Sequence, residues 1–346
     1  MRIAYIVPSL LNAGPVNVVH DLVEVMLQHG HECIVYYFDN KKAQHFSCET
    51  QKISMLKHID MNKYDVIHTH GVRPNCYLLL HKPLSCTAHC IATFHNYVFE
   101  DYSYIYPKYV AVPGAYLTLI STYRHHKVIA LSRDAMNYYN RWMKEEKLVF
   151  AYNTRKVDFS KGLTSHEKEE IVSFKKNSLL IGINSGVHPR KGIDLLIEAL
   201  GLLPNNYKLF IVGDGISREK YHRLSESLGV IDRIYWAGHH EEAYRYLPYY
   251  DIYALPSRSE GFPLSVLEAA AFGKTIICSD IPVFKELYTE DEVSMFELPY
   301  IESLVEAIKR AADNSAYGIN VQKKYEQMYS PEAFYNRHLK IYKSDI

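Results

Sequence analysis

Short apolar runs alternate along the chain with segments whose apolar residues recur at helical spacing, and this pattern predicts an α/β protein. In the first half, runs with the character of buried strands cover residues 2–8, 33–38, 65–71, 92–96, 128–131 and 148–153. In the second half, such runs cover residues 179–184, 207–212, 234–238, 252–255 and 274–278. Because helical segments separate the strands, we expect the sheets to be parallel.

One stretch, residues 250–279, carries the strongest functional pattern. It reads as a strand at residues 252–255, a loop, a helix that starts at Leu264, and a second strand. Glu260 lies in the loop, and Glu268 lies inside the helix. The free backbone N–H groups at the start of the helix, between these carboxylates, are suited to a phosphate. Isolated glutamates are usually solvated surface residues, but this arrangement fits a nucleotide-sugar, with its diphosphate at the helix start and its hydroxyl groups on the carboxylates.

Length and composition narrow the class of protein. A chain of 346 residues is too long for one ordinary core, so two domains are expected. The hydrophobic fraction of 48% and the charged fraction of 23% are typical of a soluble globular protein. A formal net charge of +0 gives no electrostatic reason to expect a nucleic acid partner. Six irregularly spaced cysteines and the lack of a run of about 18 apolar residues favour a cytoplasmic protein without a transmembrane helix.

Polar residues follow several predicted strands, at the edge where open α/β sheets bind ligands. His70 and His95 end two strands of the first half, and Lys191 precedes a helix of the second half. A lysine beside free N–H groups is suited to an anionic ligand. A histidine at a strand end is more often structural, so His70 is expected to be structural or near an acceptor. Neither residues 86–90 nor residues 239–242 have the spacing of a metal site; we read the latter as a polar helix start, and no metal is expected.

The sequence EGFPLSVLE at residues 260–268 resembles the donor-site motif of retaining GT-B glycosyltransferases of family 4, the glycosyl transferases group 1. The resemblance covers essentially the whole chain and is most specific in the second half. It implies two Rossmann-like parallel-sheet domains that face each other across a cleft, with a C-terminal helix that crosses back to the first domain. We expect an acceptor-side domain at residues 1–160 with the crossover helix at 330–346, a donor domain at 161–329, and a linker within the polar residues 155–177.

The resemblance also implies roles for individual residues. Glu260, His95 and Lys191 would be catalytic: Glu260 orients the sugar, His95 contacts the sugar and the diphosphate, and Lys191 neutralises the diphosphate. Glu268 would bind ribose hydroxyls. The other residues that would contact the donor are Gly14, Arg190, Gly213, Gly238, Gly261, Phe262, Pro263, Leu264 and Ser265. The second phosphate-binding cation of the family, an arginine, would fall at Ser185 or Gly186, where this chain has none; Arg190 is its candidate replacement.

The implied activity is retaining transfer of a hexose from a nucleotide-sugar, for which we expect a UDP-sugar, to a glycan or lipid-linked glycan acceptor. The resemblance implies no metal and no cofactor beyond this substrate, and a role in bacterial surface polysaccharide synthesis (O-antigen, lipopolysaccharide or capsule). Residues 97–127 are tyrosine-rich and weakly basic. This composition fits sugar stacking or peripheral contact with the inner face of the cell membrane, although tyrosine is frequent throughout the chain.

Three alternatives stay open on the sequence. A GT-B protein that binds sugar nucleotides or glycans without catalysis would fit the missing arginine. A GT-B epimerase would use the donor without an acceptor. A nicotinamide oxidoreductase has the least support, because neither half carries the glycine fingerprint followed by a ribose-binding acid.

Overall fold

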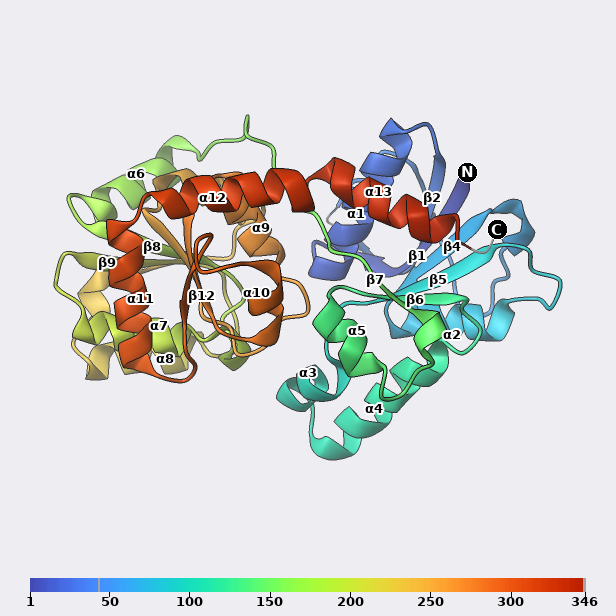
Figure 1. The fold of residues 1–346 in the computed structure, drawn as a ribbon, viewed down its shortest axis with the longest axis horizontal. Coiled ribbons are helices and arrows are strands. Elements are labelled where there is room, and N and C mark those ends of the chain that lie inside the picture. Colours follow the sequence, from blue (N-terminus) through green and yellow to red (C-terminus); the bar gives the residue numbers. More distant parts are fainter. Residues whose placement is uncertain (43, 345–346) are drawn as a thin grey trace. The chain divides into compact units, whose positions relative to one another are not determined.

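Two parallel β-sheets organise the chain in its computed structural model, which describes residues 1–42 and 44–344. Each sheet forms the centre of one of two units (Figure 1). Unit 1 comprises Met1–Arg155 and Tyr329–Ile346, and unit 2 comprises Lys156–Met328. The predicted α/β class, with two Rossmann-like parallel-sheet domains, is confirmed.

The sheet of unit 1 has seven strands in the order β3-β2-β1-β4-β5-β6-β7, and all its pairs are parallel. The strands are β1 (Arg2–Leu10), β2 (Glu32–Lys42), β3 (Glu49–Lys52), β4 (Val66–His70), β5 (His89–Phe94), β6 (Lys127–Ala130) and β7 (Leu148–Phe150). Every residue of β4 and β5 is buried, including the three polar residues that end β4 (VIHTH). The strand order reverses between β1 and β4, so ligands are expected beyond the carboxyl ends of these strands.

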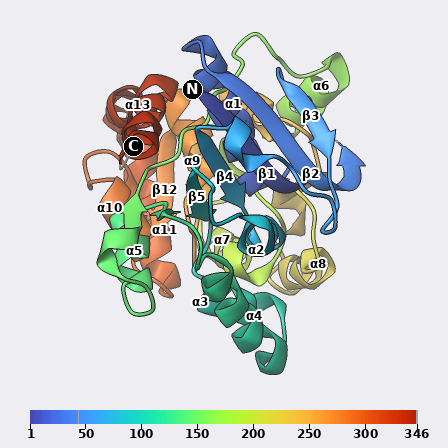
Figure 2. The same cartoon turned by 90° about the vertical axis from the view of Figure 1, so that its right-hand side faces the viewer.

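Helices connect the strands of unit 1 (Figure 2). They are α1 (Gly14–Gln28), α2 (Val72–His81), α3 (Val98–Ile105), α4 (Lys108–Ser121) and α5 (Arg133–Tyr139), with single 3-10 turns at Met61–Lys63 and Glu145–Lys147. The last helix, α13 (Pro331–Tyr342), belongs to unit 1 and packs against α1. Its first turn is capped by Ser330, whose hydroxyl accepts a hydrogen bond from the backbone N–H of Ala333.

The sheet of unit 2 has six parallel strands in the order β10-β9-β8-β11-β12-β13. The strands are β8 (Leu179–Asn184), β9 (Tyr207–Val212), β10 (Ile234–Gly238), β11 (Ile252–Leu255), β12 (Thr275–Ser279) and β13 (Ser294–Phe296). The chain enters at β8, builds outward to β10, and then returns to the other side of β8 to continue at β11. The strand order therefore reverses between β8 and β11, directly beside the stretch that carries the EGFPLSVLE motif.

The helices of unit 2 include one that the sequence analysis did not expect. They are α6 (Ser165–Lys175), α7 (Ile193–Leu202), α8 (Arg218–Ser227), α9 (Leu264–Ala271), α10 (Pro282–Leu287), α11 (Ile301–Asp313) and α12 (Ala316–Lys324), with 3-10 turns at Pro189–Lys191, Ile231–Arg233 and Ala243–Tyr249 and a π-helical turn at Tyr325–Tyr329. The prediction of a linker at residues 155–177 is wrong for Ser165–Lys175, because these residues form α6. This helix begins with a capping box, in which Thr164 and Glu167 satisfy each other's backbone N–H groups.

Buried tyrosines with hydrogen-bonded hydroxyls recur in both cores. In unit 1, the Tyr342 hydroxyl lies 2.8 Å from Nδ1 of His68 and 3.3 Å from the hydroxyl of Tyr5. All three side chains are buried. In unit 2, the Tyr250 hydroxyl donates a hydrogen bond of 2.8 Å to Oδ1 of Asn184. Because a buried hydroxyl needs a partner, the contacts of Tyr342 fix α13 on the sheet of unit 1.

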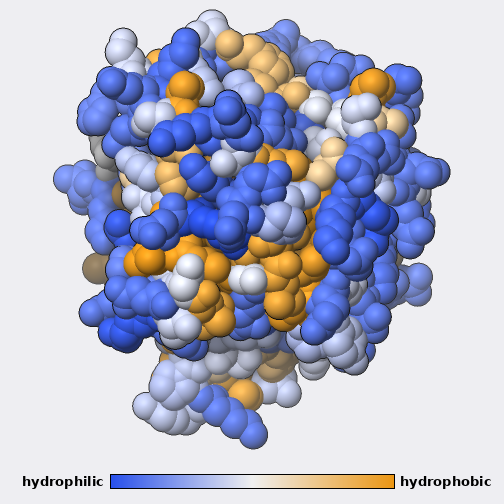
Figure 3. Space-filling view, turned by 90° about the vertical axis from the view of Figure 1, so that its left-hand side faces the viewer, coloured by the Kyte–Doolittle hydropathy of each residue, from blue (hydrophilic) through white to orange (hydrophobic). Residues whose placement is uncertain are grey.

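The surface of unit 2 also carries apolar side chains. Figure 3 shows a band of apolar residues between hydrophilic ones on the side where β9 lies in Figure 1. The exposed apolar residues of unit 2 include Val172, Leu202 and Leu228. Exposed apolar side chains are ordinary on a protein surface. None of the helices in the described part of the chain is long and apolar enough to cross a bilayer.

Replacing Tyr342 with Phe should destabilise unit 1, because it removes the hydroxyl partner of a buried imidazole nitrogen. The expected loss is about 1–3 kcal/mol in the free energy of unfolding. Tyr335→Phe is the matched control on the same helix, since its hydroxyl contacts Nε2 of His31 at 3.1 Å in a part-buried position. Urea denaturation should show the larger loss for Tyr342→Phe; wild-type stability in that variant would contradict the anchoring role.

Candidate functional site

Two loops meet where the strand order of unit 2 reverses. Residues 185–192 follow the carboxyl end of β8, and residues 256–263 follow the carboxyl end of β11. The two strands are hydrogen-bonded neighbours, with Ile252 paired to Ile181. Parallel pairing therefore brings together loops that are about 70 positions apart in the sequence.

A buried ion pair joins the two loops. The Nζ atom of Lys191 lies 2.5 Å from Oε1 of Glu260, whose side chain is only 5% exposed. The same carboxylate oxygen accepts a hydrogen bond of 2.6 Å from the Ser257 hydroxyl. Two predicted catalytic residues thus lie in direct contact, and each holds the other in place.

Two opposing effects set the pKa of the Glu260 carboxyl. Burial raises the pKa, but the charges of Lys191 and Arg190, together with the hydrogen bonds from Lys191 and Ser257, outweigh burial and hold the pKa below its usual value. Because the folded-state pKa is depressed, the ionised carboxylate stabilises the fold above its unfolded-state pKa. This contribution is lost as the pH falls through the folded-state pKa.

Arg190 supplies the second cation near this carboxylate. Its Nη1 atom lies 3.6 Å from Oε2 of Glu260 and donates a hydrogen bond of 2.9 Å to the carbonyl oxygen of Ser259. Arg258, a third cation of these loops, is engaged elsewhere, since its guanidinium forms a bidentate pair with Asp194 at 2.8 and 2.9 Å. Arg258 therefore holds the loops together, and Arg190 and Lys191 form the positively charged part of the site.

Glycine is required where the backbones of these loops approach each other. At Gly192, φ is +68°, and a Cβ atom would lie 2.0 Å from the carbonyl oxygen of Pro256. At Gly213, a Cβ atom would lie 1.9 Å from the carbonyl oxygen of Ser185. The N–H of Gly213 donates a hydrogen bond of 2.7 Å to the carbonyl oxygen of Gly238. The predicted donor-binding glycines Gly213 and Gly238 are thus adjacent, at the carboxyl ends of β9 and β10.

The helix that follows Glu260 starts as predicted. Pro263 occupies the N-cap position of α9, and no side chain caps the helix. The N–H of Val266 donates to the carbonyl oxygen of Pro263, so the N–H groups before it, those of Leu264 and Ser265, keep their capacity for a ligand. Burial raises the pKa of the Tyr253 hydroxyl, and the charges of Glu268 and Glu260 act in the same direction. Both carboxylates therefore lie near enough to the Tyr253 hydroxyl to act on its pKa. The predicted residues Gly261, Phe262 and Pro263 are buried, and Leu264 and Ser265, in the first turn of α9, are partly exposed.

Sequence reasoning missed two contributors to this site. Ser257 donates a hydrogen bond to the Glu260 carboxylate. The only sign of this role in the sequence is that Ser257 lies three residues before Glu260. His188 lies in the loop beside Lys191 and Arg190. Burial and these two positive charges lower its pKa to about 4, so the imidazole is neutral at neutral pH. Its neutral state leaves the charge of the site to Lys191 and Arg190.

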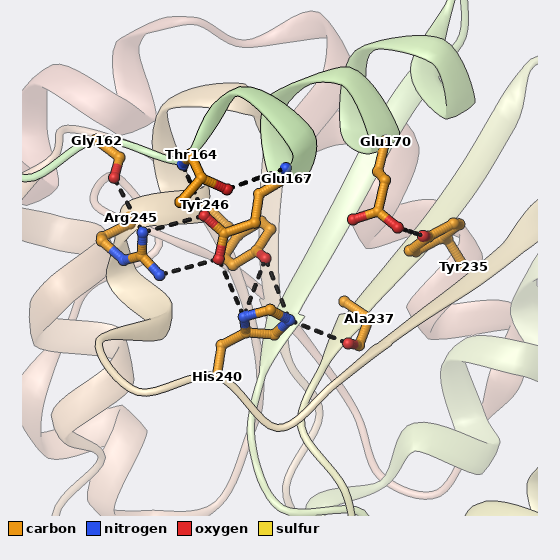
Figure 4. Close-up of polar contacts among 9 residues, drawn as sticks. All are labelled: Gly162, Thr164, Glu167, Glu170, Tyr235, Ala237, His240, Arg245 and Tyr246. Carbon is orange, nitrogen blue, oxygen red and sulfur yellow. Dashed lines mark hydrogen bonds and ion pairs between the residues drawn. The ribbon is translucent and has the colours of Figure 1, made fainter.

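Residues 239–242 lie directly before a 3-10 helix, Ala243–Tyr249, with Glu242 at the N-cap, which agrees with the predicted polar helix start. The His240 ring bridges Oε1 of Glu167, 3.1 Å from Nδ1, and the carbonyl oxygen of Ala237, 3.1 Å from Nε2 (Figure 4). Arg245 donates to both oxygens of the same carboxylate, at 3.0 and 3.2 Å. Burial raises the pKa of the Glu167 carboxyl, but the hydrogen bonds with Thr164 and the hydrogen bonds and charge of Arg245 hold it at about 2. The cluster fixes the chain just after Gly238.

Two predicted site residues, Gly14 and His95, belong to unit 1. Gly14 is the first residue of α1, and a Cβ atom added there would meet nothing within 4 Å, so crowding within unit 1 does not require glycine. His95 follows β5 directly, and its Nε2 atom lies 2.8 Å from Nδ1 of His70, the last residue of β4. Gly14 and His95 thus follow strand ends of one sheet, as predicted.

The part of the chain that the structure describes contains no group of three or more His, Cys, Asp or Glu side chains placed to hold a metal ion. In the region considered for a metal site, a hydrogen bond with Cys90 lowers the pKa of Cys86 to about 6.

Comparison with known proteins relates this geometry to a family. Residues 165–330 match the family model described as glycosyl transferases group 1. The chain is similar to WclY, an O-antigen biosynthesis glycosyltransferase of Escherichia coli, with 28% identity over 323 residues that cover 91% of this chain and 90% of that protein. It is also similar to the UDP-Gal:alpha-D-GlcNAc-diphosphoundecaprenol alpha-1,3-galactosyltransferase of E. coli, with 24% identity over 279 residues, or 77% of this chain and 71% of that protein.

Among solved structures, the chain resembles the crystal structure of Anabaena Alr3699/HepE in complex with UDP and glucose. The TM-score is 0.81 at 15% identity, and the match covers 99% of this chain and 100% of that chain. This likeness confirms the predicted GT-B fold. The matched family model spans the segment that contains Lys191, Glu260 and Glu268, so these comparisons support glycosyltransferase activity.

Removing the cation of the buried pair should cost more stability than neutralising its acid. Lys191→Met leaves a charged carboxylate buried with only Arg190 nearby, and the expected loss is about 3–5 kcal/mol in the free energy of unfolding. Glu260→Gln should cost less, and the double variant should recover part of the loss of Lys191→Met. Urea denaturation of all three variants measures this coupling. Strictly additive losses would show that the pair does not act as a unit.

Proposed function

We propose that this chain is a retaining glycosyltransferase that moves a sugar from a UDP-sugar to a glycan or lipid-linked glycan during assembly of a bacterial surface polysaccharide. The observation that carries the proposal is the Lys191–Glu260 pair beside the start of α9, at the point where the strand order of unit 2 reverses. The family match over this segment supports the reaction class. The names of the relatives support the acceptor class, and the name of the E. coli galactosyltransferase gives UDP-Gal as its donor.

The charges of the site fit the chemistry of glycosyl transfer. Cleavage between the anomeric carbon and the phosphate leaves negative charge on the diphosphate and positive charge on the sugar. Lys191, Arg190 and the N–H groups at the start of α9 would stabilise the diphosphate, in positions fixed before the substrate arrives. Glu260 would orient the sugar and stabilise its positive charge. These groups make the transfer independent of a bound metal.

The remaining predicted residues divide between the nucleoside and the acceptor side. Glu268 would bind the ribose hydroxyls, and the adjacent Gly213 and Gly238 would leave room for the base beside β9 and β10. His95 would contact the sugar and the diphosphate from unit 1. The acceptor hydroxyl would attack from the side of the leaving group, with the departing phosphate helping to remove its proton.

A lipid surface is proposed as the place where the acceptor is met. Helix α4 has its small residues on the inside, where Ala111, Ala115, Thr118 and Ser121 are buried, and its large apolar residues on the outside. The large apolar side chains exposed by about half or more are Tyr109 (79%), Tyr116 (48%), Leu117 (49%), Ile120 (61%) and, just after the helix, Tyr123 (80%).

This exposed stripe has the composition of an interfacial helix. The sequence of α4 contains no acidic residue, and cations lie at both ends of the stripe, at Lys108 and Arg124. Tyrosine places an apolar ring and a polar hydroxyl at the level of lipid headgroups, and cations favour anionic headgroups. The stripe therefore supports peripheral contact of unit 1 with the inner face of the cell membrane.

The second candidate function is sugar-nucleotide binding without catalysis. It is favoured by Ser185 and Gly186, which offer no cation where the family has an arginine. Arg190 counts against it, because its guanidinium lies beside the Glu260 carboxylate and can neutralise a diphosphate in the same place.

A donor screen followed by a transfer assay tests the proposed function. We expect UDP and one UDP-sugar to raise the melting temperature more than other nucleotides, and the labelled sugar to pass to a lipid-linked glycan. Glu260→Ala should reduce transfer at least about 100-fold through lost sugar orientation and charge stabilisation. Glu268→Ala should mainly weaken donor binding. Wild-type transfer by Glu260→Ala would refute its role, and donor binding without transfer to any acceptor would favour the second candidate.

Vesicle flotation tests the lipid surface. The double variant Leu117→Ser/Ile120→Ser should bind vesicles containing anionic phospholipid at least about tenfold more weakly, since one fully buried apolar side chain contributes about 1.5–3 kcal/mol. Ile319→Ser, which changes a residue of unit 2 with similar exposure (58%), is the matched control. Equal binding by the double variant and the control would contradict the proposal.

A further inference from the structure

Three histidines lie close together in unit 1: His68 in the middle of β4, His70 at its end, and His95 just after β5. His68 and His70 are fully buried, with ring centroids 4.2 Å apart, and the ring centroids of His70 and His95 are 5.1 Å apart. A positive charge on the neighbouring rings of His68, His95 or His338 would further oppose protonation of His70. Burial lowers the pKa of each of these rings, so all of them are neutral at neutral pH, and each must choose which nitrogen carries its proton.

The contacts of His70 determine that choice. Its Nδ1 atom lies 2.8 Å from Nε2 of His95. Its Nε2 atom is buried and has no hydrogen-bond partner among the residues that the structure describes. A buried N–H group without an acceptor is rarer in proteins than a buried acceptor without a donor. The proton of His70 therefore belongs on Nδ1, and this N–H donates to His95.

The state of His95 follows from this donation. Because Nε2 of His95 accepts the hydrogen bond, it carries no proton, and in the neutral ring the proton is on Nδ1. The neighbouring ring of His68 does not compete for this bond. Its Nδ1 atom contacts the Tyr342 hydroxyl at 2.8 Å, and its Nε2 atom contacts Oγ1 of Thr93 at 2.7 Å.

We propose that His70 is a positioning residue that locks His95 in the tautomer with its proton on Nδ1, so that His95 offers an N–H donor to the donor substrate. This inference rests on the proposed function for the identity of that substrate. An N–H donor matches the phosphate oxygens and sugar hydroxyls of a nucleotide-sugar. The opposite tautomer would present a bare nitrogen, which repels a phosphate oxygen.

Nuclear magnetic resonance of the protein labelled with ¹⁵N-histidine measures the tautomer without substrate. Ring ¹⁵N shifts separate a nitrogen that carries a proton from one that does not, and His95→Gln identifies the signals of His95. We expect the proton of His95 on Nδ1 and that of His70 also on Nδ1. A proton on Nε2 of His95 in the wild-type protein would overturn the inference.

Two variants of His70 separate positioning from simple packing. In His70→Asn, the side-chain amide N–H lies near the former Nδ1 position and can still donate to His95. In His70→Phe, the ring volume is kept and the donor is lost. We expect His95 to keep its tautomer in the Asn variant and to populate the other tautomer in the Phe variant.

Transfer kinetics should follow the tautomer. His70→Phe should lower kcat about 10- to 100-fold, by analogy with the loss of the hydrogen-bond partner of a metal-ligating histidine, and His70→Asn should keep most of the activity. Equal kcat for the two variants would overturn the positioning role. If the wild-type protein transferred sugar from none of the donors but showed the expected ¹⁵N shifts, the proposed function would be contradicted and the tautomer assignment would stand.

Discussion

The contact between Lys191 and Glu260 is the interaction on which the candidate site depends. A carboxylate that is almost fully buried stays ionised only when cations and hydrogen-bond donors compensate for the lost water. Here the compensation comes from Lys191 and Arg190 in one loop and from Ser257 in the other. The charge state of Glu260 therefore depends on how closely the loops after β8 and β11 approach each other.

Several features of unit 2 serve this approach. The parallel pairing of β8 with β11 brings the loops to the same edge of the sheet. Gly192 allows contact with the carbonyl of Pro256, and the bidentate pair of Arg258 with Asp194 links the second loop to the start of α7. None of these features would take part in the proposed reaction. Each one, however, fixes the position of a charged group that would.

The sequence predicted most strands and the elements around Glu260 because buried parallel strands and a helix start leave local patterns. It did not reveal α6, since this helix is charged and exposed on most sides, and only the capping box of Thr164 and Glu167 marks it. It could not distinguish Arg190 from Arg258, because their roles depend on contacts between loops far apart in the chain. The hydrogen bond from His70 to His95 likewise joins two strands, and no local pattern encodes it.

Unit 1 is built from two separate pieces of the chain, and unit 2 is continuous from Lys156 to Met328. During synthesis, all residues of unit 2 are therefore translated before those of α13. Until that helix emerges, the sheet of unit 1 lacks Tyr342, and the Nδ1 atom of His68 lacks its hydroxyl partner. The histidine-lined end of the first sheet thus reaches its final arrangement only after α13 (Pro331–Tyr342) has been made, although the strands that carry these histidines are made much earlier.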